Sequence, residues 1–303
     1  NEKNVGHRTP TRESLGDFLM GTLVKDLVSL VKPTILLLSV IMGGMGIALA
    51  PEATDFSLAF FSLVGIGMLV GAANALNMVI ERDVDPMMAR TRKRPVAAGR
   101  LSPHFAAAYG IMLGITGLGL LHIFANALSS AIGLASLVAY VLIYTPLKQR
   151  TPLALIIGAF PGAAPPLMGW TAATGTIDLP GLVVFGIVLL WQIPHFLAIS
   201  LYRKEDYIRA GIRSVPNVRG DRVAKLQAIA YCLAMIPLSV LLVPLGSAGW
   251  IYGVGALGCS LWFFWVCIRD NAPTQVWAKK LFLVSLGYLP MLCVIFAIDR
   301  MLL

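Results

Sequence analysis

Long apolar segments recur along the whole chain, and they constrain its fold more than any other feature of the sequence. Soluble domains do not contain many apolar runs of about 20 residues, which is the length that a helix needs to cross a bilayer. Hydrophobic residues make up 57% of the chain and charged residues only 13%. We therefore predict an all-α polytopic membrane protein with nine transmembrane helices, over residues 33–50, 56–79, 104–121, 123–144, 152–172, 180–201, 226–244, 248–268 and 280–298.

Positively charged residues fall almost entirely on one side of these segments. With nine spans, 23 of the 24 Lys and Arg residues lie in the N-terminal segment or in the connections on its side, and only Arg300 lies opposite. Cytoplasmic connections of membrane proteins are enriched in Lys and Arg. We therefore predict a cytoplasmic N-terminus and an outside C-terminus. The same placement explains the net charge of +9. Cations beside apolar segments contact lipid headgroups and set the topology, so the charge does not indicate nucleic-acid binding.

Two long connections on the cation-rich side, 80–103 and 202–225, divide the expected membrane domain. We expect a polar cytoplasmic segment over 1–25 and a single nine-helix domain over 26–303. Each long connection follows an apolar helix and carries acidic residues first and cations after. Four helices separate them, which suggests a weak internal repeat that brings both to the mouth of one central cavity. The four cysteines lie inside apolar segments, as buried free thiols do.

The densest charge lies in the stretch from Asn77 to Pro95, NMVIERDVDPMMARTRKRP. Asn77, Glu81 and Asp85 are spaced i, i+4, i+8 and share one helix face, and Asp83 stays near them because Pro86 disfavours helix at the residue before it. Hard oxygen donors suit Mg²⁺, which proteins hold through carboxylates and phosphate oxygens. Four cations that could bind a polyanion follow: Arg90, Arg92, Lys93 and Arg94.

This stretch indicates a metal-bridged diphosphate site, although a solvated turn with internally paired charges is the common explanation of a charge run. Asn77 favours the functional interpretation, because an amide inside an apolar helix costs free energy unless it finds a partner. The spacing Asn77-x3-Glu81-x3-Asp85, followed by RTRKRP, resembles the NxxxDxxxD and RTxxRP signature of the UbiA superfamily of intramembrane prenyltransferases.

Further stretches are similar to the branch of this superfamily that farnesylates heme, and together the similarity covers about residues 32–220. They are YTPLKQRTPLA from Tyr144, GAFPGAAPPLMGW from Gly158, WQIPHF from Trp191 and YRKEDYIRAGI from Tyr202. The resemblance implies a UbiA-type fold and Mg²⁺-dependent transfer of farnesyl from farnesyl diphosphate to a vinyl group of heme B, with addition of water.

The resemblance also implies roles for particular residues. The second loop supplies Asp206 as a further acid beside the metal, so the implied metal ligands are Asn77, Glu81, Asp85 and Asp206. The implied diphosphate contacts are Arg90, Arg94, Lys148 and Lys204. His195 is implied to face the heme, as an axial ligand through an imidazole nitrogen; a hydrogen-bonded structural histidine explains it equally well.

Three positions depart from the superfamily pattern. Glu81 stands where Asp is usual, which lengthens the reach of the carboxylate. The second loop has Glu205 and Asp206 in place of a DxxxD pair, so a single-metal arrangement is conceivable. Arg213 and Ser214 replace the apolar pair expected after AGI.

Two other functions stay open. One is a UbiA-type prenyltransferase with a quinone precursor or chlorophyllide as acceptor. The other is a transporter or heme carrier, whose ionisable residues should lie near the bilayer midplane, whereas here they lie at one edge. The expected partners are the two substrates, membrane lipid and, from the family alone, a heme A synthase. No transit segment is recognisable, which favours a bacterial plasma (inner) membrane with a cytoplasmic active side.

Overall fold

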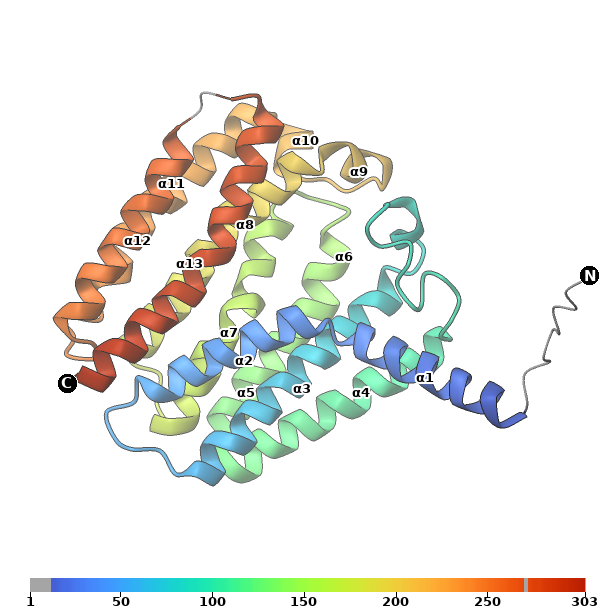
Figure 1. Ribbon diagram of the computed structural model, residues 1–303, viewed down its shortest axis with the longest axis horizontal. Helices are drawn as coiled ribbons and strands as arrows, with labels where there is room; N and C mark the ends of the chain where they lie inside the picture. Colours follow the sequence, from blue (N-terminus) through green and yellow to red (C-terminus); the bar gives the residue numbers. More distant parts are fainter. Residues whose placement is uncertain (1–11, 270–271, 303) are drawn as a thin grey trace, which may run out of the picture.

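Helices account for every regular element that the structure, a computed structural model, describes in residues 12–269 and 272–302 (Figure 1). The long helices are α1 (Arg12–Leu30), α2 (Pro33–Ala48), α3 (Phe56–Ile80), α4 (Pro103–Leu120), α5 (Ala127–Val138), α7 (Ala154–Thr174), α8 (Leu179–Tyr202), α11 (Asp221–Val240), α12 (Trp250–Ile268) and α13 (Thr274–Leu302). The short elements are η1 (Asp85–Met87), η2 (Leu121–Ala125), η3 (Ala139–Tyr144), α6 (Thr145–Leu147), α9 (Lys204–Arg209) and α10 (Val215–Arg219).

Each predicted apolar segment overlaps one of these helices or a run of consecutive helices, so the all-α prediction is confirmed. Seven helices are long and apolar enough to cross a membrane, and α1 with α2, bent by 49° at a short break, would make an eighth. Helix α7 does not reach this hydropathy; it carries three prolines. The count of nine spans and the orientation of the termini stay predictions.

Two differences from the sequence expectation change how the helices divide. The break predicted at Leu121–His122 falls at Asn126 instead, because the wide π-type turn η2 continues α4 and Asn126 caps α5, accepting a hydrogen bond from Ser129 N at 2.8 Å. Helix α1 was not predicted, and it runs across the expected boundary at residue 25. It ends before Lys32, whose positive φ of 50° turns the chain into Pro33 at the start of α2.

The long connections meet at one end of the helix bundle, together with the end of α6 (Figure 1). Met88 of the first loop packs against Ala210 and Ile212 of the second in a small buried cluster. This contact confirms the prediction that the two loops converge. The short connections 49–55, 175–178 and 241–249 lie at the opposite end.

Helix α7 lies inside the bundle, against α2, α5 and α8. At Gly169 an added Cβ would overlap the carbonyl oxygen of Gly43 in α2, so the two backbones can approach this closely only with glycine there. Because Pro165 has no N–H, the carbonyl of Pro161 lacks its helical donor. Ser136 of α5 supplies one, donating to that carbonyl at 3.1 Å.

The end of α13 holds the ends of two other helices. Buried Asp299 accepts hydrogen bonds from the backbone N–H groups of Gly249 at 2.6 Å and Tyr252 at 3.1 Å, which are free donors at the start of α12. Arg300 donates to the carbonyl oxygens of Ala48 and Leu49, at the end of α2. Helices α2, α12 and α13 are thereby fastened together at the end of the bundle that lies away from the long loops.

Candidate active site

A cavity of about 400 Å³ lies among α2, α3, α5, α7, α8 and α13, and we call it the main cavity. Its size is within the range of roughly 300–1,000 Å³ of ligand sites. The residues at its inner part come from the middle of helices and are mostly apolar, among them Met42, Leu69 and Met168, with Gln192 and His195 as polar members. Those at its rim come from the loop end of the bundle and are polar: Lys32, Asn77, Glu81, Arg90, Arg94 and Lys148.

The rim charges form one connected network. Glu81 accepts from Lys148 Nζ at 2.9 Å and from Arg94 Nη1 at 3.3 Å. The same Arg94 nitrogen donates to both carboxylate oxygens of Asp85 at 2.8 Å. Glu81 is the C-cap of α3, and Asp85 N bonds to Glu81 O at 2.8 Å, so the helical turn continues past the cap. The predicted i, i+4 stack therefore brings both carboxylates to one cation.

Ionisation of these groups follows from burial and pairing. Burial opposes the charged form of Glu81, but Lys148 and Arg94 outweigh it and lower the pKa of Glu81 below its usual value. In the same pair, burial disfavours the Lys148 ammonium, yet Glu81 raises its pKa. Burial raises the pKa of Asp85 despite the opposing charge of Arg94. The network therefore contains one firmly ionised carboxylate and one that protonates more readily.

Asn77 lies a turn before Glu81 and has the partners that its burial requires. Its Oδ1 accepts from Lys32 Nζ at 3.3 Å, and its Nδ2 donates to Thr145 Oγ1 at 3.3 Å. Lys32 has the one positive φ of a non-glycine residue in the described chain, a conformation that costs free energy and is found at functional sites more often than elsewhere. The backbone turn at Lys32 thus delivers a cation to the rim.

Besides Asp85, which is fully buried in its pair with Arg94, three predicted residues do not line the main cavity. Asp83 has a side chain that is 84% exposed and pairs with Arg82, because two residues past Glu81 the helical turn faces away. Asp206 pairs with Arg209 and, at 4.0 Å, with Arg203 in its own loop. The third is Lys204, which is held by Asp221 at 2.7 Å.

His195 lines the main cavity, stacked on Trp191 with ring centroids 4.9 Å apart. Its Nδ1 lies 2.7 Å from Ser285 Oγ of α13. When the hydroxyl of Ser285 donates to Phe282 O, 2.6 Å away, Nδ1 carries the proton of its hydrogen bond with Ser285. The Nε2 atom then keeps its lone pair, and a neutral imidazole with a free lone pair is the form that binds metals.

Ser285 was not singled out from the sequence, and neither were other contributors from α13. Its carbonyl also accepts from Trp191 Nε1 at 2.8 Å, and Leu286 and Leu289 line the cavity. A serine in an apolar helix is a common packing residue, so only the three-dimensional contact identifies it. Tyr140 and Tyr144 also line the cavity. Tyr144 begins the stretch YTPLKQRTPLA and Tyr140 lies just before it, and neither was assigned a role from the sequence.

The rim offers carboxylate oxygens of the kind that Mg²⁺ prefers. Within the described residues no three His, Cys, Asp or Glu side chains cluster as a complete ligand set. Mg²⁺ needs fewer, because it keeps several waters and takes phosphate oxygens from its substrate. Two carboxylates, Glu81 and Asp85, already converge on one cationic nitrogen of Arg94. The donor chemistry therefore fits a metal that is completed by a diphosphate.

The fold and the cavity define an integral membrane protein of helices with a charged rim over an apolar chamber. Solved structures share this fold: a UbiA homolog from Aeropyrum pernix K1 (TM-score 0.73, 20% identity, 88% of this chain and 98% of that one) and a UbiA homolog from Archaeoglobus fulgidus bound to GPP and Mg²⁺ (0.69, 15%, 90% and 99%). The protoheme IX farnesyltransferase of Anaeromyxobacter sp. (strain Fw109-5) is 44% identical over 274 residues, 89% of this chain and 92% of the relative.

Residues 36–286 match the model of the UbiA prenyltransferase family. The chain belongs to this family. The match extends through α11 and α12 and into α13, beyond the residues on which the sequence resemblance rests.

Proposed function

We propose that this protein transfers the farnesyl group of farnesyl diphosphate to a vinyl group of heme B, with addition of water, giving heme O and diphosphate. The observation that carries the proposal is the charged rim at the mouth of an apolar chamber, in a chain that is 44% identical to a protoheme IX farnesyltransferase along most of its length. We also propose that the rim faces the cytoplasm of a bacterium.

The rim would bind the diphosphate. Lys148, Arg90 and Arg94 bring three positive charges against the two carboxylates Glu81 and Asp85, so the rim carries excess positive charge. As the allylic C–O bond breaks, negative charge develops on the leaving diphosphate, and fixed cations stabilise that charge more than they stabilise the ground state. Arg90 has no acidic partner among the described contacts, so it is free to turn to the substrate, whereas Lys32 is held by Asn77 Oδ1 at 3.3 Å.

Mg²⁺, held by Glu81 and Asp85 with Asn77 beside them, would add positive charge to the leaving group and orient it. Support for this metal comes from the A. fulgidus homolog, which was solved with GPP and Mg²⁺. To hold the metal, Glu81 and Asp85 would exchange Lys148 and Arg94 for it, and Asp206 would likewise have to leave Arg209.

The apolar chamber would accept the prenyl chain and exclude water from the allylic cation. The vinyl carbon attacks this cation and forms the new C–C bond. Water then adds to the cation left beside the porphyrin and releases a proton. His195, with its Nε2 lone pair available, is suited to ligate the heme iron and so to orient the vinyl group toward the chamber.

The proposal is tested by adding Mg²⁺, farnesyl diphosphate and heme B to the detergent-solubilised protein and looking by mass for farnesylated heme. Asp85→Asn is expected to reduce turnover at least a hundredfold, and Asp178→Asn, which changes an exposed acid at the other end of the bundle, leaves it unchanged. If farnesylated product formed with a quinone precursor but not with heme, the acceptor would be the quinone precursor. Full activity of Asp85→Asn would refute the metal assignment.

A further inference from the structure

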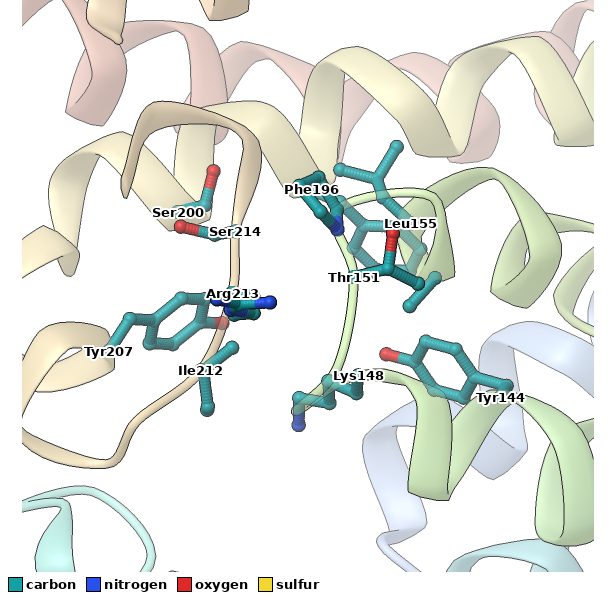
Figure 2. A pocket seen from close by; sticks show the side chains of 12 residues that line it. Tyr144, Lys148, Thr151, Leu155, Phe196, Ser200, Tyr207, Ile212, Arg213 and Ser214 are labelled. Atoms are coloured by element: carbon teal, nitrogen blue, oxygen red, sulfur yellow. The ribbon is translucent and has the colours of Figure 1, made fainter. Parts of the chain in front are cut away.

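A second, smaller pocket adjoins the main cavity at the loop end, and we call it the side pocket. Its volume is about 70 Å³, and it shares four lining residues with the main cavity: Tyr144, Lys148, Phe196 and Tyr207. Figure 2 shows Arg213 and Tyr207 on one side of it and Lys148 with Tyr144 on the other. The side pocket is therefore separated from the main cavity only by side chains.

The charge of the side pocket is positive. Two cations line it, Lys148 and Arg213, and its lining contains no acidic residue. Lys148 is neutralised by Glu81 on the side of the main cavity. Arg213 has no ion-pair partner in the part of the chain that the structure describes; its one recorded hydrogen bond runs from Nη1 to the carbonyl of Arg150 at 3.3 Å. Most of its donors are thus uncommitted.

A second observation points to a polar ligand here. Ser214 Oγ lies in the lining, is buried, and has no hydrogen-bond partner among the described residues. A buried hydroxyl without a partner costs free energy, and such groups call for an explanation. An anion bound between Arg213 and Ser214 supplies the missing partner.

The chemistry of the lining distinguishes between anions. A diphosphate with its metal needs carboxylates nearby, and those lie at the rim, on Glu81 and Asp85, rather than in the side pocket. A volume of about 70 Å³ holds a few water molecules or one short acidic arm, and it is too small for a porphyrin ring. A carboxylate therefore fits best, and arginine binds carboxylates with two parallel hydrogen bonds.

We propose that the side pocket binds a propionate carboxylate of the porphyrin acceptor through Arg213 and Ser214, and that it thereby selects a carboxylate-bearing acceptor. This inference rests on the proposed function for the identity of the acceptor. Heme B carries two propionates on one edge of the ring. Because the chamber is apolar, that edge has to lie at its water-facing side, where cations can pair with the propionates.

The test compares heme B with its dimethyl ester in two assays on the full-length protein: equilibrium binding followed by the heme absorbance, and steady-state turnover. Arg213→Met is expected to weaken binding of heme B and raise its KM about tenfold, which is the scale of one charge-assisted hydrogen bond at a partly exposed site. It should change the values for the ester less than twofold and leave the KM for farnesyl diphosphate unchanged. Ser214→Ala should show a smaller effect of the same kind.

Two further variants serve as controls. Arg213→Lys keeps the charge and should stay within about threefold of the wild type. Arg219→Met removes an exposed cation of α10 that lines neither cavity and should change nothing. Equal weakening of heme B and its ester, no weakening, or a raised KM for farnesyl diphosphate alone would each overturn the side-pocket proposal.

The two assays separate this inference from the proposed function. If the wild type binds heme B with the expected dependence on Arg213 but forms no farnesylated heme, the side pocket stands and the proposed activity fails. If farnesylated heme forms normally and Arg213→Met binds heme B like the wild type, the activity stands and the side pocket fails. Absence of heme binding by the wild type would refute both.

Discussion

The buried ion pair between Arg94 and Asp85 should contribute far more to stability than the exposed ion pair between Arg82 and Asp83 in the same loop. Both oxygens of Asp85 lie 2.8 Å from Arg94 Nη1, and the side chains are 0% and 14% exposed. Breaking a buried pair by removing one partner costs about 3–5 kcal/mol. Glu81 keeps Lys148 as a partner, so we expect Arg94→Met to lower the free energy of unfolding by about 3 kcal/mol, at the lower end of this range.

A double-mutant cycle isolates the interaction. We expect a coupling energy of about 2 kcal/mol between Arg94→Met and Asp85→Asn, measured by unfolding in mixed detergent and SDS micelles. The matched cycle uses Arg82→Met and Asp83→Asn, whose exposed side chains lie 3.6 Å apart, and it should give less than about 0.5 kcal/mol. Equal coupling in the two cycles would show that burial does not control this interaction.

The pH dependence gives a second check on the same pair. Burial raises the pKa of Asp85, and loss of Arg94 raises it further because an opposing cation is gone. An ionised buried carboxylate therefore costs stability at neutral pH, and this cost is relieved as the pH falls through the raised pKa. The loss caused by Arg94→Met should be largest near pH 7 and smaller in acid; a loss that grows on acidification would contradict the reasoning.

Further predictions concern the metal, the rim, the helix packing and the histidine. EDTA should abolish turnover and added Mg²⁺ restore it, measured by product mass. The pKa of Glu81 is lowered, so its ion pairs contribute stability that is complete above the usual pKa of a glutamate and is lost as the pH falls through the lowered pKa. Glu81→Gln should therefore flatten the acid side of a plot of unfolding free energy against pH. Gly169→Ala should destabilise by about 3 kcal/mol through overlap with backbone, whereas Gly119→Ala, with open space around it, should be neutral or stabilising in thermal unfolding. Ser285→Ala should weaken heme binding at His195 several-fold without changing the KM for farnesyl diphosphate, since it frees the imidazole to change tautomer; unchanged heme affinity would argue against an orienting role.

The helices could be predicted because lipid requires every spanning backbone group to bond within its own segment, which makes apolar length a direct signal. The ends were less predictable, since polar residues extend helices past the apolar run. Thus α13 begins at Thr274 rather than 280, and α11 begins at Asp221 rather than 226. The break at Asn126 depended on a cap and a tertiary contact with Thr171 O at 2.7 Å, which no local pattern contains.

The rim was the more predictable part of the site, because Asn77, Glu81 and Asp85 follow one another at helical spacing and spacing fixes their common face. The second loop was not predictable in the same way. Whether Asp206 turns to the cavity or to Arg209 depends on local pairing, and charge spacing permits both. Ser285 could not be found either, since its role arises only where α13 meets α8.

The contacts made by Asp299 and Arg300 have a consequence for how the molecule is assembled. Helix α2 leaves the ribosome early and α13 late, yet the free carbonyls at the end of α2 and the free amides at the start of α12 are satisfied by residues 299 and 300. Since α2 and α13 both wall the main cavity, the chamber can close only after synthesis has passed these last turns. A nascent chain in the membrane would hold every rim residue before α13 completes the wall of the main cavity.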